Sequence, residues 1–266
     1  MKVNNVIEEY KTPSLFQRVY SVWFRHVRVY TSNFYSNAFP PFFEPIIFLA
    51  GLGIGLGAII PKMDNINYLL FLASGLIVTS SMFTAAYECT FGTFIRLEFD
   101  KVYDGMLGAP ISPNNLIVGE ILFAGAKGLF FSFAVLAVTW IVGIIKYPLS
   151  IMTIFVGFIT GIMFAALSMF ITSFVTNINH FNFYFTGLIS PMFFFSGVVF
   201  PIENLPKPLA YAAEVIPLTH VVRIARAFCV PGLLRFRLLF DLVYCILFTI
   251  VFGWFAIKGI KKRLIV

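Results

Sequence analysis

The sequence predicts an all-α protein that crosses a membrane several times. Two of the observations behind this class are compositional: 59% of the 266 residues are hydrophobic and only 12% are charged, and the mean hydropathy is +0.91. A soluble domain of this length is about half apolar and about a quarter charged. The third observation is a set of six apolar runs. Each reaches the roughly 20 residues that a helix needs to cross a hydrocarbon core.

The six predicted spans follow one another with short connections. A tight turn at Lys146 and Pro148 must divide the third from the fourth. No soluble linker or second domain is visible, so we expect residues 1–266 to form one membrane domain. The spans cover approximately 38–60, 67–92, 116–145, 151–176, 181–200 and 238–258.

Residues 1–33 are polar and then amphipathic. From Ser14 to Tyr30, apolar and aromatic residues recur at steps of three and four, which is typical of a helix lying in the lipid headgroup region. The alternative is a helix packed on a soluble partner. No apolar core is followed by a small-residue cleavage site, so we expect no cleaved signal peptide. The side chains expected to meet lipid are Arg18, Trp23, Arg25 and Arg28.

The basic residues predict the orientation, because cytoplasmic segments carry the excess of lysine and arginine. With both termini in the cytoplasm, the inner segments hold most of the basic residues, and the short outer turns hold only Lys62 and Lys146. Segment 201–237 is an exception, but long outer segments follow the rule less strictly. Orientation explains the formal charge of +7 better than nucleic-acid binding does, and we expect no nucleic-acid partner. The inner basic residues are Lys2, Lys11, Arg18, Arg25, Arg28, Arg96, Lys101, Lys258, Lys261, Lys262 and Arg263.

Glycines in the first span have the spacing of a helix-packing motif. Gly51 and Gly55, and likewise Gly53 and Gly57, lie four residues apart, which lets two membrane helices approach closely. A phosphate-binding loop would need a strand before it, and none is predicted here. The stretch 119–128 lacks the spacing of a nucleotide-binding loop, so any ATP must be bound elsewhere.

Five ionisable residues are predicted within or at the edge of spans: Glu44, Glu88, Glu120, Lys127 and Asp241. Charges inside a membrane are costly and usually face a bundle interior or an aqueous path. Glu88 or Glu120 could neutralise Lys127 if the second and third spans pack together. Two interpretations stay open: a structural ion pair, or part of a substrate path.

The sequence offers no catalytic or metal-binding constellation. His26, His180 and His220 are scattered, and the three cysteines form no closely spaced pair. We therefore expect no metal site and no enzymatic activity in this chain.

Segment 201–237 is too polar for a full span and too apolar for a free loop. One or two short helices that dip back into the outer leaflet, shielded by protein, would satisfy both facts. A structural or gating role is expected for its polar residues, although Pro217 interrupts the helical face that they would share. These residues are Glu203, Glu214, His220 and Arg223.

The densest internal run of charge lies between the second and third spans. Arg96, Glu98, Asp100, Lys101 and Asp104 fall within nine residues. The predicted orientation places this stretch in the cytoplasm, where a soluble partner could bind it.

Three stretches together resemble permease subunits of ABC-2 type transporters. They are PPFFEPIIFLAGLGIGLG, residues 68–128, and FFFSGVVFPIENLPKPLAYAAEVIPLTHVVRIAR. The most specific part is the segment with Glu88, Gly92 and the run APISPNNLIVGE. The resemblance is greatest to the nodulation-factor (lipo-oligosaccharide) exporter permeases, the NodJ type. It implies six spans, an interfacial helix, a cytoplasmic coupling helix after span two, and re-entrant outer helices after span five.

The resemblance also implies partners and a location. Such permeases lie in the bacterial inner membrane and work as a homodimer with two copies of a soluble ATPase, which holds the ATP and Mg, so this chain needs no cofactor. Their substrates are amphipathic: lipid-linked saccharides, lipo-oligosaccharides, lipids or hydrophobic drugs. The residues expected to couple to the ATPase are Arg96, Glu98, Phe99, Asp100, Lys101, Tyr103 and Asp104.

The expected mechanism is ATP-driven closure of the ATPase dimer, which pushes on 96–104 and on the interfacial helix. A path then opens along spans one, two and five. The rival hypotheses are a secondary transporter or channel that works without ATP, and a membrane enzyme that acts on lipids. An ATPase that co-purifies with the chain would separate them.

Overall fold

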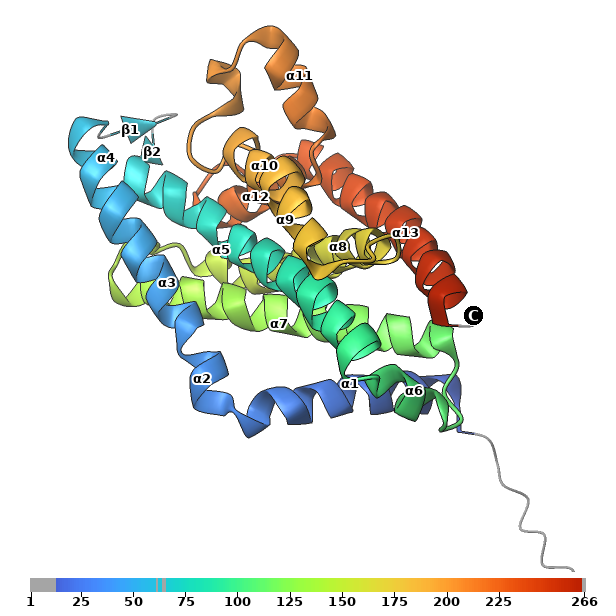
Figure 1. Cartoon of the computed structure of the whole chain (residues 1–266). Helices are drawn as coiled ribbons and strands as arrows, with labels where there is room; N and C mark the ends of the chain where they lie inside the picture. The colour runs from blue at the N-terminus through green and yellow to red at the C-terminus, as the bar shows by residue number, and fades with distance from the viewer. Residues whose placement is uncertain (1–12, 61, 64–65, 265–266) are drawn as a thin grey trace, which may run out of the picture.

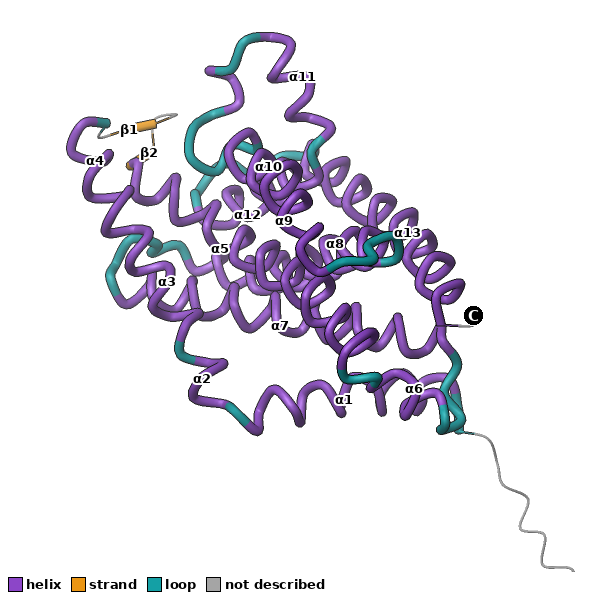
Figure 2. Tube along the Cα trace, viewed as in Figure 1, coloured by secondary structure: helices purple, strands orange, loops and turns teal. Residues whose placement is uncertain are grey.

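The computed structural model describes residues 13–60, 62–63 and 66–264, which form a bundle of long helices with a short helix lying across one end (Figure 1). Lys2 and Lys11, which contributed to the predicted orientation, lie outside the described residues. Helix accounts for almost the whole trace in Figure 2. The described residues contain one small sheet that the sequence did not predict. It is an antiparallel hairpin of β1 (Lys62–Met63) and β2 (Ile66–Asn67).

Five helices in the described residues are long and apolar enough to cross a membrane. They coincide with the predicted spans one, two, three, four and six. The first, Phe34–Gly57, is made of α2 (Phe34–Ala38), α3 (Pro40–Phe48), the π-helical η1 (Leu49–Ile54) and the start of α4 (Gly55–Ile59). The second, Tyr68–Phe99, is made of α5 (Tyr68–Tyr87) and the π-helical η2 (Glu88–Gly92) and η3 (Ile95–Phe99). The other three are α7 (Pro113–Ile141), the pair η4 (Pro148–Met152) and α8 (Thr153–Thr172), and α13 (Arg237–Leu264).

The predicted span 181–200 is a shorter helix. Its three parts have four, five and six residues: α9 (Phe181–Tyr184), the π-helical η6 (Phe185–Ile189) and α10 (Ser190–Phe195). At 1.5 Å per residue it is about 22 Å long, less than the roughly 30 Å of a hydrocarbon core. The count of six spans therefore stays a prediction.

Short helices occupy the connections where the sequence predicts them. One lies between the second and third spans, and two α-helices lie in segment 201–237. Figure 1 places α6 and α1 at the lower end of the bundle and α11 at the upper end. Whether α11 and α12 dip into a leaflet stays a prediction. The short elements are α6 (Val102–Leu107), η5 (Ile178–His180), η7 (Ile202–Asn204), α11 (Lys207–Val215) and α12 (Pro217–Cys229).

The helix across the lower end, α1 (Leu15–Ser32), is fixed at both ends by hydrogen bonds. Ser14 N donates to Gln17 Oε1 at 2.9 Å and Gln17 N donates to Ser14 Oγ at 3.3 Å, which is a capping box. At the other end, the Tyr30 hydroxyl donates to Asn37 O at 2.9 Å, and Asn37 Nδ2 donates to Tyr30 O at 2.7 Å. These bonds set the corner between α1 and the first span. The amphipathic helix is present, and its position at a membrane surface stays a prediction.

Small residues let the central helices α5, α7 and α8 approach closely. A Cβ on Gly128 of α7 would lie 2.9 Å from Gly157 O of α8. Beside it, Ser132 Oγ donates to Ile77 O at 2.8 Å and lies 2.9 Å from Ser81 Oγ. Small residues and hydroxyl bonds of this kind hold membrane helices together where no hydrophobic driving force acts between them.

The glycines of the first span are less tightly packed within this chain. A Cβ on Gly53 would meet the side chain of Leu69 in α5, and one on Gly57 would make only an ordinary contact. On Gly51 and Gly55 a Cβ would meet nothing within 4 Å. Close packing at Gly51 and Gly55 therefore needs a partner beyond this chain, and it stays a prediction.

Candidate functional site

A network of charged side chains lies at the α1 end of the bundle. Glu88, at the start of η2, is its centre. Glu88 Oε2 lies 2.7 Å from Lys127 Nζ on α7, and Glu88 Oε1 lies 2.8 Å from Arg96 Nη1. The three side chains are between 12% and 17% exposed. The structure thus joins Glu88 and Lys127, two of the predicted membrane charges, to Arg96, the first residue of the charged run between the second and third spans.

Arg96 extends this network to α7 and α1. Its Nη2 lies 2.7 Å from Glu120 Oε2, to which the Thr93 hydroxyl donates at 3.0 Å. The other oxygen of this carboxylate, Glu120 Oε1, lies 2.9 Å from His26 Nε2. Glu120 is 1% exposed and His26 is 3% exposed. The buried carboxylate therefore ties α1 to the end of the second span.

The charges in this network balance. Glu88 and Glu120 are met by Arg96 and Lys127, and every carboxylate has a cation within 3 Å. Buried charges are tolerated when they are paired and are costly when they are not. The geometry favours the ion-pair interpretation over the substrate-path interpretation for these residues. Glu44 lies on α3, and its side chain is outside the described part of the structure.

The residues expected to meet an ATPase divide into an exposed and a buried group. Lys101 has φ 51°, a left-handed conformation that is uncommon outside glycine, and it turns the chain sharply into α6. Arg96 and Tyr103 instead face the interior, and Tyr103 is 1% exposed. Burial, together with the nearby Glu120, raises the pKa of Tyr103 well above its usual range, so the hydroxyl stays neutral. The exposed group, which we call the 99–104 turn, consists of Phe99, Asp100, Lys101 and Asp104.

Glu98 connects this turn to the C-terminal helix. Its Oε1 lies 2.9 Å from Arg263 Nη2 of α13, and its Oε2 lies 3.7 Å from Lys101 Nζ. Arg263 Nη1 also donates to Thr172 O at the end of α8, at 2.7 Å. Glu98 and Arg263 therefore link the start of the turn to α8 and α13.

Two members of this assembly, His26 and Arg263, were not predicted from the sequence. His26 could have been found, because it continues the buried stripe of Val19 and Val22 on one face of α1. Nothing in the sequence pairs Arg263 with Glu98, which is 165 residues away.

The helix α1 presents two different faces. Its inner face packs against α7, where a Cβ on Gly119 would lie 2.6 Å from the Val22 side chain. Its outer face exposes a stacked aromatic row of Phe16, Tyr20 and Phe24. The residues predicted to meet lipid are all partly or fully exposed: Arg18, Trp23, Arg25 and Arg28.

An aromatic groove of about 450 Å³ lies between the first span, α5 and α10. The Phe193 ring lies 5.8 Å from that of Phe48 and 6.0 Å from that of Phe83, measured between centroids. The predicted path along spans one, two and five runs through the same place. Hydroxyl groups also line the groove, from Thr79, Ser80 and Thr84.

The predicted outer residues form a second ionic cluster, with Asp241 as an additional member. Arg223 Nη2 lies 2.7 Å from Glu214 Oε1, and its Nη1 lies 2.7 Å from Asp241 Oδ1. His220 Nδ1 lies 2.6 Å from the same Asp241 oxygen. Pro217 begins α12 and separates Glu214 on α11 from the other residues, so the cluster joins three helices rather than one face.

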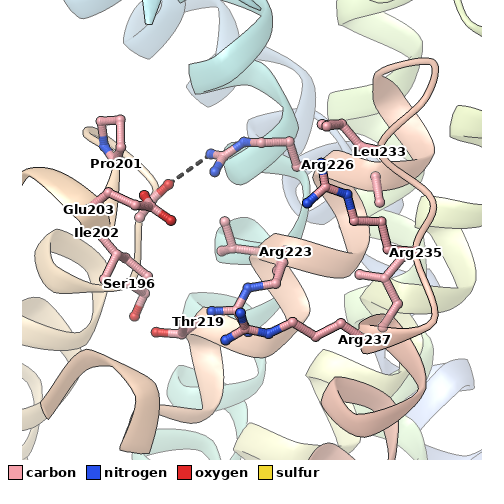
Figure 3. Close-up of a pocket in the computed structure, with 14 residues that line it drawn as sticks. Ser196, Pro201, Ile202, Glu203, Thr219, Arg223, Arg226, Leu233, Arg235 and Arg237 are labelled. Atoms are coloured by element: carbon pink, nitrogen blue, oxygen red, sulfur yellow. Dashed lines mark hydrogen bonds between the residues drawn. The ribbon is translucent and has the colours of Figure 1, made fainter. Parts of the chain in front are cut away.

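Glu203 lies apart from that cluster, on the wall of a cavity of about 340 Å³. It faces the arginines across the cavity (Figure 3), where the dashed line marks the hydrogen bond from Arg226 to Gly197 O. Four arginines line this cavity: Arg223, for which the sequence predicts a structural or gating role, and Arg226, Arg235 and Arg237.

Comparison with known proteins places these features in a family. Residues 17–230 match the family described as ABC-2 type transporter. Nodulation protein J of Sinorhizobium fredii (strain NBRC 101917 / NGR234) is 31% identical over 77% of this chain and 79% of its own length. Nodulation protein J of Rhizobium leguminosarum bv. viciae is also 31% identical, over 77% and 80%. The inner membrane transport permease YadH of Escherichia coli (strain K12) is 21% identical over 76% and 78%. The chain belongs to the ABC-2 type transporter family.

Proposed function

We propose that this chain is the membrane subunit of an exporter and that a separate ATPase drives it. One observation carries the proposal: the exposed 99–104 turn directly follows Arg96 and Glu98, whose short ion pairs reach the second span, α7 and α13. Glu98 binds Arg263 of α13, and Arg96 binds Glu88 and Glu120. An exposed, charged turn with rigid inward connections is suited to receive force from a soluble partner.

The force would spread along these contacts. Closure of the ATPase pushes on the turn, and the Arg96–Glu120–His26 connection carries the movement to α7 and α1. The Glu98–Arg263 pair carries it to α13. Tilting of the first span against α5 and α10 then widens the aromatic groove. ATP and Mg are held by the partner, and the chain itself catalyses no reaction.

The proposed assembly is a homodimer in the bacterial inner membrane, with two ATPase copies and with both termini in the cytoplasm. The open sides of Gly51 and Gly55 support a second copy as the partner of the first span. The lysines at the end of α13 support a cytoplasmic C-terminus.

The proposed substrate is amphipathic: a lipid-linked saccharide, a lipo-oligosaccharide, a lipid or a hydrophobic drug. The groove offers phenylalanine rings for apolar or sugar faces and hydroxyls for polar groups. Movement is outward, as in the exporter permeases that the sequence resembles.

The test uses the chain reconstituted in proteoliposomes with the ATPase that co-purifies with it. Candidate glycolipids and lipids are screened for stimulation of ATP hydrolysis, and the stimulating compound is then followed for transport. We expect transport that requires ATP and stops when the lysine of the ATPase nucleotide-binding loop is changed to alanine. Transport without ATP, or the absence of any co-purifying ATPase, would contradict the proposal.

A further inference from the structure

Two cavities of opposite character meet at the upper end of α13. The first, of about 340 Å³, is the arginine-lined cavity of Figure 3, and the second, of about 590 Å³, is almost entirely apolar. Arg235 and Leu238 line both. We infer that the joined cavities bind one anionic phospholipid of the surrounding membrane, with its phosphate among the arginines and an acyl chain in the apolar cavity. This site is separate from the aromatic groove proposed for transport.

The arginines that line the polar cavity are not all paired with carboxylates in the described residues. Arg223 is paired with Glu214 and Asp241, and Arg237 lies 3.4 Å from the same Glu214 carboxylate. Arg235 has no carboxylate within 4.0 Å among the residues that the structure describes, and it stands on the wall shared by the two cavities. A phosphate is the group that such arginines bind best, because their planar N–H forks match its oxygens.

Arg226 shapes the floor of the polar cavity. Its Nη2 donates to Gly197 O at 2.8 Å, its Nε donates to Ser74 Oγ at 3.2 Å, and its guanidinium lies 3.6 Å from the centre of the Phe71 ring. Glu203 lies on the opposite side of the cavity from Arg235 (Figure 3). The acidic residue of the cavity is therefore apart from Arg235, where we place the phosphate.

The apolar cavity fits the hydrocarbon part of the same molecule. It lies between the start of α8, the end of α12 and the start of α13, and its walls include Phe155 and Leu239, which are 59% and 52% exposed. An apolar slot that opens between helices, beside a cationic pocket, complements an amphiphile with an anionic head. Long basic side chains beside apolar helices bind anionic lipid headgroups in this way.

The test measures lipid retention by native mass spectrometry of the intact protein in neutral detergent, without ATP or ATPase. The probes are phosphatidylglycerol, phosphatidylcholine with the same acyl chains, and inorganic phosphate as a competitor. We expect phosphatidylglycerol to be retained over phosphatidylcholine. Arg235→Gln should weaken that retention at least tenfold, since a charged hydrogen bond is worth about 1.5–3 kcal/mol and about 1.4 kcal/mol is a factor of ten. Lys207→Gln, which removes an exposed cation of α11 that lines neither cavity, is the matched control and should have no effect.

A second variant pair tests the acyl chain. Leu239→Trp should fill the apolar cavity and reduce retention, whereas Leu247→Trp, two turns further along α13 and 57% exposed, should leave it unchanged. Equal retention of both lipids, equal effects of Arg235→Gln and Lys207→Gln, or no effect of Leu239→Trp would each overturn the assignment. Displacement of the lipid by millimolar phosphate would show a site for free anions and would also overturn it. Since no transport is measured, failure here leaves the proposed export function untouched.

Discussion

Lys127 Nζ lies 2.7 Å from Glu88 Oε2, which joins α7 to the end of the second span. Arg96 binds the other oxygen of the same carboxylate. Glu88 thus holds two cations in place, one inside the helix bundle and one beside the 99–104 turn. Loss of this carboxylate should affect both the stability of the bundle and the position of the turn.

Glu88→Gln should lower the free energy of unfolding by about 3–5 kcal/mol, the usual cost of leaving a buried charge unpaired. Lys127 would lose its carboxylate, while Arg96 would keep Glu120. Glu88→Gln/Lys127→Met should recover most of the loss, because the second change removes the stranded cation. Thermal unfolding of the single and double variants in detergent measures both effects. Purely additive losses would mean that the pair is not coupled.

Gly119→Val should loosen α1 from α7, because its side chain would enter the space that Val22 occupies. Overpacking of this kind typically costs about 1–3 kcal/mol. We expect trypsin to cleave after Arg25 faster in this variant, as read by mass spectrometry. The matched control is Gly253→Val on α13, where an added Cβ meets nothing within 4 Å. The same cleavage rate in both variants would argue against docking of α1 at Gly119.

Gly51→Leu/Gly55→Leu should weaken the dimer. An added Cβ at either position meets nothing within 4 Å. In the most apolar part of the first span, which carries both glycines, only 25% of the residues are buried within the chain. Bulky side chains there would keep two copies of the helix apart. Light scattering of the purified protein measures the change in mass. Gly253→Leu on α13, where an added Cβ also meets nothing within 4 Å, serves as the control. If only the control dissociates, the dimer contact lies on α13.

The sequence predicts a helix correctly where the apolar run is long and unambiguous. Long apolar runs predict five of the helices, because about 20 consecutive apolar residues are typical of a helix that crosses a membrane. The run 181–200 reads like the other runs but contains a short broken helix that ends before Gly197, whose φ is 79°. Composition cannot detect this, because Phe193 and its neighbours are as apolar as a full span.

The candidate site was predicted in part for a similar reason. The density of charge indicated a functional stretch between Arg96 and Asp104. The cost of placing charges in a membrane predicted that Glu88 or Glu120 pairs with Lys127. The sequence could not indicate that Arg96 turns inward while Asp100 faces out. This depends on the π-helical end of the second span and on the left-handed Lys101.

The coupling of ATP hydrolysis to export in a turn variant tests the central claim most directly. Asp100→Ala/Lys101→Asn removes two exposed charges, and asparagine tolerates the left-handed backbone that Lys101 adopts. Lys261→Asn, which changes an exposed charge near the end of α13, is the control. We predict that the amount of substrate exported per ATP falls about 5–150-fold, the range of a typical coupling energy, with thermal unfolding unchanged. Normal export per ATP in the Asp100→Ala/Lys101→Asn variant would contradict the account.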